Sequence, residues 1–115
     1  MTALVKLLTG EEEITLGGLL HTLDNPNPYS TSTSDNFGRV VAISGNYAIA
    51  GAYLEDDAGG TSSGKAYIFS TSTGALLHTL DNPTAYGTSA NDRFGYSVAI
   101  SESYAIVGAD RKSVV

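Results

Sequence analysis

The sequence has no cysteine, no tryptophan, one methionine and three prolines among its 115 residues. Without cysteine, the chain can form neither a disulfide framework nor a thiolate metal site. No stretch approaches the 18 consecutive apolar residues of a membrane-spanning helix, and the N-terminus lacks the basic and apolar regions of a signal peptide. We therefore expect no membrane insertion, while the absence of cysteine leaves the compartment open.

Basic residues are scarce as well. Six Lys and Arg face twelve Asp and Glu, so the net charge is −6, and we expect no nucleic-acid partner. The charged fraction of 16% is too low for a coiled coil, and the apolar fraction of 42% is too high for a disordered tail. The abundant residues are glycine, at 13, and serine plus threonine, at 25, a composition typical of β-rich chains with many turns.

An internal repeat organises the chain. Residues 19–26 (LLHTLDNP) recur as residues 76–83, 57 positions later. Aligned without a gap, residues 19–52 and 76–109 are identical at 23 of 34 positions. Identity at this level indicates duplication of one structural unit. We divide the chain into an N-terminal segment, 1–17, and a repeat region, 18–115, with the first repeat at 19–75 and a partial second at 76–115.

Each complete unit is predicted to contain four strands. Apolar, β-branched runs bounded by turn residues lie at 37–44, 47–52, 65–70 and 75–80. No helical period of apolar residues extends beyond about two turns, so we expect under about a tenth helix. The runs are nearly continuous rather than alternating, which indicates a sheet covered on both faces.

The predicted fold class is all-β, with four-stranded antiparallel meander repeats packed as β-propeller blades. A stacked β-sandwich or solenoid of the same units is the alternative. Residues 37–80 supply all four strands of one blade. Residues around 14–23 supply the fourth strand of another blade, with room for its third strand, and residues 94–109 supply a first and a second strand. The chain thus holds about two blades, one whole and one split.

A split blade predicts self-association. Propellers have about four to eight blades, so one chain cannot close a ring, and open blade edges favour pairing. The C-terminal half-blade of one copy is expected to pair with the N-terminal half-blade of the next. Such a head-to-tail contact closes a ring if the rotation fits and otherwise continues as a filament. The alternative is that the sequence is a fragment of a longer array.

A pair of short motifs recurs in register with the strands. Phe-Gly is followed about fourteen residues later by Gly-Ala, as Phe37-Gly38 with Gly51-Ala52 and as Phe94-Gly95 with Gly108-Ala109. This pattern resembles the FG-GAP repeat, known from the propeller heads of integrin alpha chains and from bacterial surface proteins. The resemblance implies a non-enzymatic propeller located outside the cell, on the cell surface or on a virion surface.

Two departures from the family pattern matter. The proline that follows Gly-Ala is replaced by Tyr53 and Asp110, and the hairpin turns 44–46 and 101–103 lack the calcium loop of the integrin type. Those turns offer too few oxygen atoms for calcium. We therefore expect no metal and no cofactor, and the chain is closer to the calcium-free bacterial variants.

The candidate ligand-binding residues lie in the polar loops. Exposed tyrosine combines an apolar ring with a polar tip, and an acidic loop could bind a hard cation. Consecutive carboxylates lack the alternate spacing of calcium loops, so a solvated loop is the more frequent role of such a run. The candidates are Tyr29, Tyr86, Tyr53, Glu55, Asp56 and Asp57. For the three tyrosines, packing remains an equal alternative, whereas Tyr47, Tyr67 and Tyr104 are predicted to pack between blades.

No catalytic constellation is apparent. His21 and His78 occupy one repeat position, on outer strands with one side toward solvent, and cannot build a catalytic triad. Asp35 and Asp92 precede Phe-Gly, where a carboxylate stabilises a turn. We predict a non-catalytic recognition or assembly module, with itself or another protein as partner. A lectin-like glycan binder and a structural subunit of an extracellular filament, coat or virion are the alternatives.

Overall fold

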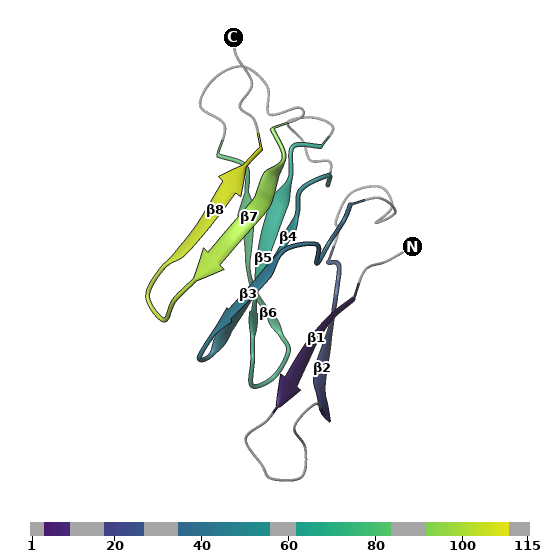
Figure 1. Cartoon of the computed structure of the whole chain (residues 1–115), viewed down its shortest axis with the longest axis vertical. Coiled ribbons are helices and arrows are strands. Elements are labelled where there is room, and N and C mark those ends of the chain that lie inside the picture. The colour runs from purple at the N-terminus through teal and green to yellow at the C-terminus, as the bar shows by residue number, and fades with distance from the viewer. Residues whose placement is uncertain (1–3, 10–17, 27–34, 56–61, 84–91, 111–115) are drawn as a thin grey trace.

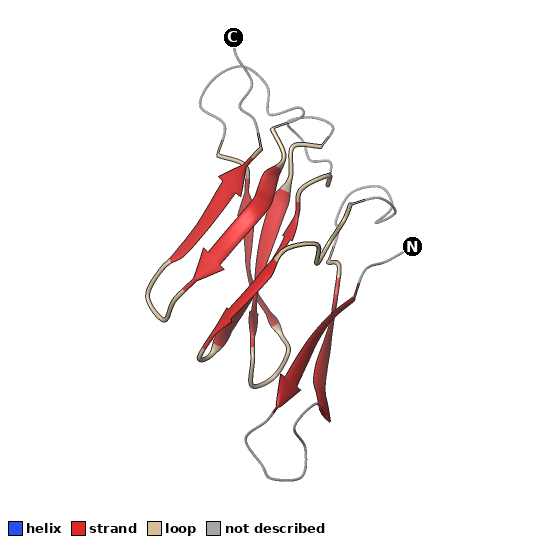
Figure 2. Cartoon of the chain, in the orientation of Figure 1, coloured by secondary structure: helices blue, strands red, loops and turns tan. Residues whose placement is uncertain are grey.

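The computed structural model describes residues 4–9, 18–26, 35–55, 62–83 and 92–110 (Figure 1). These residues form eight β-strands and no helix (Figure 2). The strands are β1 Leu4–Thr9, β2 Gly18–Asp24, β3 Val41–Ser44, β4 Tyr47–Ala52, β5 Lys65–Ser70, β6 Leu76–Asp81, β7 Phe94–Ile100 and β8 Ala105–Ala109. The all-β class is confirmed. None of the described residues belongs to a helix that could cross a membrane.

The strands form three antiparallel sheets. The central sheet has the order β3-β4-β5-β6, which is the predicted meander, and the two-stranded sheets β1-β2 and β7-β8 flank it (Figure 1). The predicted first strand, 37–44, is shortened to Val41–Ser44. Asn36 and Gly38 precede this strand with positive φ, at 59° and 85°, as the equivalent Arg93 and Gly95 have at the start of β7.

The sheet β1-β2 is a copy of the last two strands of the central blade. Leu4 pairs with Asp24 as Lys65 pairs with Asp81, and the register shifts between Leu7 and Leu8 as it does between Ile68 and Phe69. The third strand of this half-blade therefore lies in the segment 1–17, earlier than the range around 14–23 in which we expected it. The connection between β1 and β2 is longer than that between β5 and β6, so β1 falls outside the 57-residue period.

The sheet β7-β8 is a copy of the first two strands. Val98 pairs with Val107 as Val41 pairs with Ala50, and the next two pairs toward the hairpin turn correspond in the same way. The described residues therefore form one whole blade and two half-blades, one on each side of it, as predicted.

Both faces of the two central strands, β4 and β5, are covered, as the continuous apolar runs predict. Alternate residues of a strand point to opposite faces. One face packs against Leu23 of β2, and its buried cluster is Leu23, Phe37, Ala48, Ala50, Ala52, Tyr67 and Phe69. The other face carries Ile49, Ala66 and Ile68, and it packs against apolar side chains of β7 and β8. The core therefore consists of two layers, one on each side of β4 and β5.

Candidate interaction surfaces

The contact between the central blade and β7-β8 shows how two successive units pack. Val98 and Ile100 of β7 and Val107 of β8 lie against the cluster around Ile49 and Ile68. The contacts join β7 to β3, β4 and β5, so the first strand of one unit covers the middle of the preceding one. This contact is the template for any further unit.

The Phe-Gly and Gly-Ala motifs meet at this contact. A Cβ atom on Gly51 would overlap the carbonyl group of Gly95, and one on Gly64 would overlap the backbone of Phe94. The backbone N–H of Phe94 donates to the carbonyl of Ser63 at 2.9 Å. The glycines are thus required because the backbones of neighbouring units approach more closely than a side chain permits.

The aspartates before Phe-Gly link consecutive units. Asn25 Nδ2 donates to Asp35 at 2.9 Å, and the repeat-equivalent Asn82 Nδ2 donates to Asp92 at 3.0 Å. Both carboxylates are buried. Each bond ties the end of one unit's fourth strand to the start of the next unit. The same bond in both repeats supports the structural role predicted for Asp35 and Asp92.

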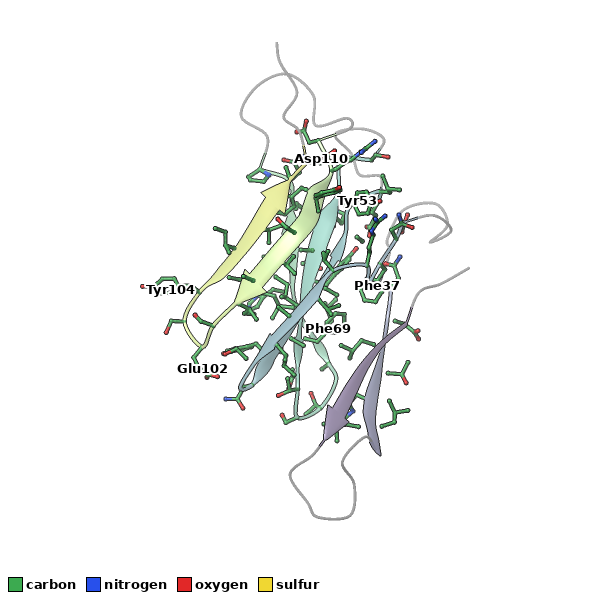
Figure 3. The ribbon with its side chains drawn as sticks, in the orientation of Figure 1. Phe37, Tyr53, Phe69, Glu102, Tyr104 and Asp110 are labelled. Atoms are coloured by element: carbon green, nitrogen blue, oxygen red, sulfur yellow. The ribbon has the colours of Figure 1, made fainter. Side chains whose placement is uncertain are left out.

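At the C-terminal end, apolar side chains that the first repeat buries are exposed. Ile106 of β8 is 70% exposed, whereas its equivalent Ile49 is 1% exposed. Tyr104 is 82% exposed, whereas its equivalent Tyr47 is half-buried. Figure 3 shows Tyr104 at the outer edge, pointing away from the central sheet. The prediction that Tyr104 packs between blades is therefore wrong within the described part of the chain, where this side chain is largely exposed.

At the N-terminal end, the complementary side chains are exposed. Val41 and Ile43 of β3 are 54% and 60% exposed, whereas their equivalents Val98 and Ile100 are half-buried against the preceding unit. The preceding unit here is β1-β2, of which the described residues form the third and fourth strands. In the described part of the chain, apolar surface is therefore exposed at both ends, and the two surfaces are the two sides of the same kind of contact.

Glu55 is fully buried, so the prediction of a solvated acidic loop is wrong at this residue. Its N–H donates to the carbonyl of Ala52 and its carbonyl accepts from Gly64, which fixes its backbone. The hydroxyl of Tyr67 donates to the carboxylate, at 2.6 and 2.7 Å from its two oxygens. Burial raises the pKa of Glu55 from 4.5 to about 7, although the bond from Tyr67 opposes the shift.

Tyr53 is also buried rather than displayed. Its hydroxyl accepts from Asn36 Nδ2 at 3.1 Å and from Arg39 at 2.9 Å. Its ring contacts the ring of Tyr96 edge-on, with centroids 5.1 Å apart. The structure thus gives Tyr53 the packing role, which was one of the two predicted for it. The remaining candidates, Tyr29, Tyr86, Asp56 and Asp57, lie outside the described residues.

The two histidines differ in their partners. His21 Nε2 lies 3.0 Å from the carbonyl of Ser72, in the turn between β5 and β6. His78 is exposed and lines an open hollow of about 180 Å³ beside the β7-β8 turn, together with Tyr47, Glu102 and Tyr104. Among the described residues, no three His, Cys, Asp or Glu side chains are grouped as metal ligands would be.

Comparison of the two repeats, rather than any single motif, identifies the candidate interaction surfaces. The candidates proposed from the sequence were polar and aromatic and did not include Val41 and Ile43, whose equivalents Val98 and Ile100 pack against the preceding unit. The strand count pointed to this surface, because the described strands form only half of a unit on each side of the central sheet.

The comparisons with known proteins agree with this geometry. Searches of curated proteins and of solved structures gave no significant match. The family model of the FG-GAP repeat matches residues 28–69 and 84–114, together more than half of the chain. The matched ranges contain both Phe-Gly and Gly-Ala motifs, whose close backbone contact joins the two units. Repeats of this type suggest a β-propeller-type protein-interaction module, generally without enzymatic activity and typical of extracellular or surface proteins. On its sequence and its blade-like sheets alike, this chain belongs to the FG-GAP repeat family.

Proposed function

We propose that this chain is a non-catalytic assembly module whose partner is a second copy of itself, joined head to tail. The supporting observation is the exposure of apolar side chains at both ends whose repeat equivalents are covered within the chain. Such a module would act outside the cell or at a surface, where repeats of this family typically occur.

The repeat gives the contacts of the proposed interface. Within one chain, Val98 and Ile100 pack against the cluster that includes Ile49 and Tyr47. The same contact between two copies places Val41 and Ile43 of one copy against Ile106 and Tyr104 of the other. Each exposed side chain then acquires the type of neighbour that its equivalent already has.

Burial of these exposed side chains contributes to the free energy of association. Burial of one Val, Ile or aromatic side chain stabilises by about 1.5–3 kcal/mol relative to full exposure. Four such side chains, each already partly covered, together contribute several kcal/mol before the entropy of association is subtracted. Since a two-stranded half-blade is marginally stable alone, completing it provides a further gain.

A pair of matched substitutions tests the proposal. Ile106→Asp places a charge in the proposed interface and is expected to shift the chain to the monomer in size-exclusion chromatography with light scattering. Leu77→Asp is the control, because Leu77 and its equivalent Leu20 are exposed to the same degree, at 43% and 45%, in both repeats. The control is expected to retain the unmodified mass.

The outcomes separate clearly. Loss of the assembly in the Ile106 variant alone, with an unchanged circular dichroism spectrum, supports the interface. Equal masses for both variants and the unmodified chain would show that this surface does not mediate association.

A further inference from the structure

Among the described strands, β8 and β1 each have a free edge where their repeat equivalents, β4 and β5, are paired on both sides. In the central sheet, β4 pairs with β3 on one side and with β5 on the other. Among the strands that the structure describes, its equivalent β8 pairs with β7 alone, and β1, the equivalent of β5, pairs with β2 alone. Unpaired edges of this kind are templates for a further strand.

The register of each half-blade is that of the complete blade. β7-β8 repeats the pairing of β3-β4, and β1-β2 repeats the pairing of β5-β6, including the position of its irregularity. β1 has six residues, as β5 has, and β8 has five, one fewer than β4. The two hairpins are therefore built as the two halves of one four-stranded sheet.

We infer that one copy donates β1 to the free edge of β8 in another copy, completing a four-stranded blade in trans. The inference rests on the proposed head-to-tail assembly and specifies its partner strand and its register. Within the central blade Ile49 lies opposite Ile68, and Tyr47 opposite Ser70. The corresponding pairs between copies are Ile106 with Leu7 and Tyr104 with Thr9.

A glycine contact supports a second copy as the occupant. Gly51 is covered by the backbone of Gly95 from the following unit, whereas the atoms nearest to a Cβ on Gly108 belong to Ser97 of its own hairpin. The place that a Phe-Gly turn would occupy on Gly108 is thus open. Gly38 offers such a turn at the other end, with φ of 85° against 96° for Gly95, and a surface hollow lies beside it.

The absence of cysteine makes the register directly testable by cross-linking. Facing residues of an antiparallel pair have Cα atoms about 4.5–5.5 Å apart, within the range of a disulfide, whereas a shift of two residues exceeds it. The double variant Leu7→Cys/Ile106→Cys is therefore expected to form a covalent ladder of chains on mild oxidation. The double variant Thr9→Cys/Ile106→Cys is the control displaced by two residues, and it is expected to give no ladder.

A measurement without substitution complements the cross-links. On assembly, the edge amides of β8 and β1 are expected to become as protected from hydrogen exchange as those of β4 and β5. Dilution below the assembly concentration should remove that protection at β8 and β1 first. This result does not depend on the folding of cysteine variants.

Each outcome has one meaning. A ladder for the Leu7 pair alone, with protection of both edges, supports strand donation in the stated register. Strand donation is overturned if the chains assemble with unprotected edges and the Leu7 pair gives no ladder, or a weaker ladder than the Thr9 pair. Head-to-tail assembly through the apolar faces would then remain. A chain that is monomeric at all concentrations overturns both.

Discussion

The buried carboxyl of Glu55 is expected to make the folded chain less stable as the pH rises, whereas a salt-bridged acid makes a fold more stable as the pH rises. Its pKa is about 7 in the folded chain, raised by burial, against an ordinary value of 4.5. The folded state therefore binds the proton more tightly than the unfolded state. The stability that protonation provides is complete below pH 4.5 and is lost as the pH rises through 7.

The size of this effect follows from the two pKa values. At 1.36 kcal/mol for each pKa unit, the difference between 4.5 and about 7 corresponds to roughly 3 kcal/mol of unfolding free energy. The groups that act on Glu55 are Tyr67, whose hydroxyl favours the carboxylate, Lys65, which also favours it, and Asp35 and Asp81, which oppose it. Lys65 and Asp81 form a salt bridge with each other.

The assay is urea unfolding followed by circular dichroism from pH 4.5 to 8.5, at one chain concentration. The unmodified chain is expected to lose about 3 kcal/mol across this range, most of it between pH 5 and 7. Glu55→Gln keeps an oxygen that accepts from Tyr67 and removes the charge, so this contribution should vanish and the variant should be the more stable at pH 8. An identical pH profile for the two chains would refute the reasoning.

Tyr67→Phe is the matched control for the direction of the effect. The substitution removes the hydroxyl that donates to the carboxylate of Glu55, so the pKa of Glu55 should rise further. The variant is then expected to lose more stability above pH 7 than the unmodified chain, and a shallower profile would contradict the assignment.

Three further predictions concern the repeated glycines, the hydrogen bond between successive units and the hairpin turns. Gly51→Ala should destabilise the fold by about 1–3 kcal/mol in urea unfolding, because its Cβ overlaps backbone of the next unit, whereas Gly108→Ala should leave the spectrum unchanged and reduce assembly. Asn82→Ala removes a hydrogen bond to buried Asp92 and should cost about 1–3 kcal/mol, against little change for the exposed Asn46→Ala. A calcium chelator should leave the melting temperature unchanged, since the hairpin turns offer too few oxygens, and a large fall would reveal a site.

Much of the fold could be predicted from the sequence because the repeat supplied two independent copies of each pattern. The strands at 47–52 and 65–70 have the predicted bounds, and the last strand of the blade differs by one residue. β1 was missed because its residues, LVKLLT, share little with KAYIFS and because the longer connection removes it from the period. Only backbone pairing reveals that the two strands are equivalent.

The candidate site was harder to predict, since burial depends on distant segments. Three consecutive acids, 55–57, have the pattern of a solvated loop, and only the fold shows that Glu55 turns inward to Tyr67. Tyr104 illustrates the opposite case. Its equivalent Tyr47 packs against the next unit, but no described strand covers Tyr104.

The mass of the unmodified chain in solution tests the central claim most directly. Light scattering at micromolar concentration is expected to give a multiple of the 11.9 kDa chain mass. Three or four copies would correspond to the six or eight blades of an ordinary closed propeller, and a broad distribution of larger masses to an open filament. A well-folded species of 11.9 kDa would contradict the account, because its exposed blade faces would then be stable without a partner.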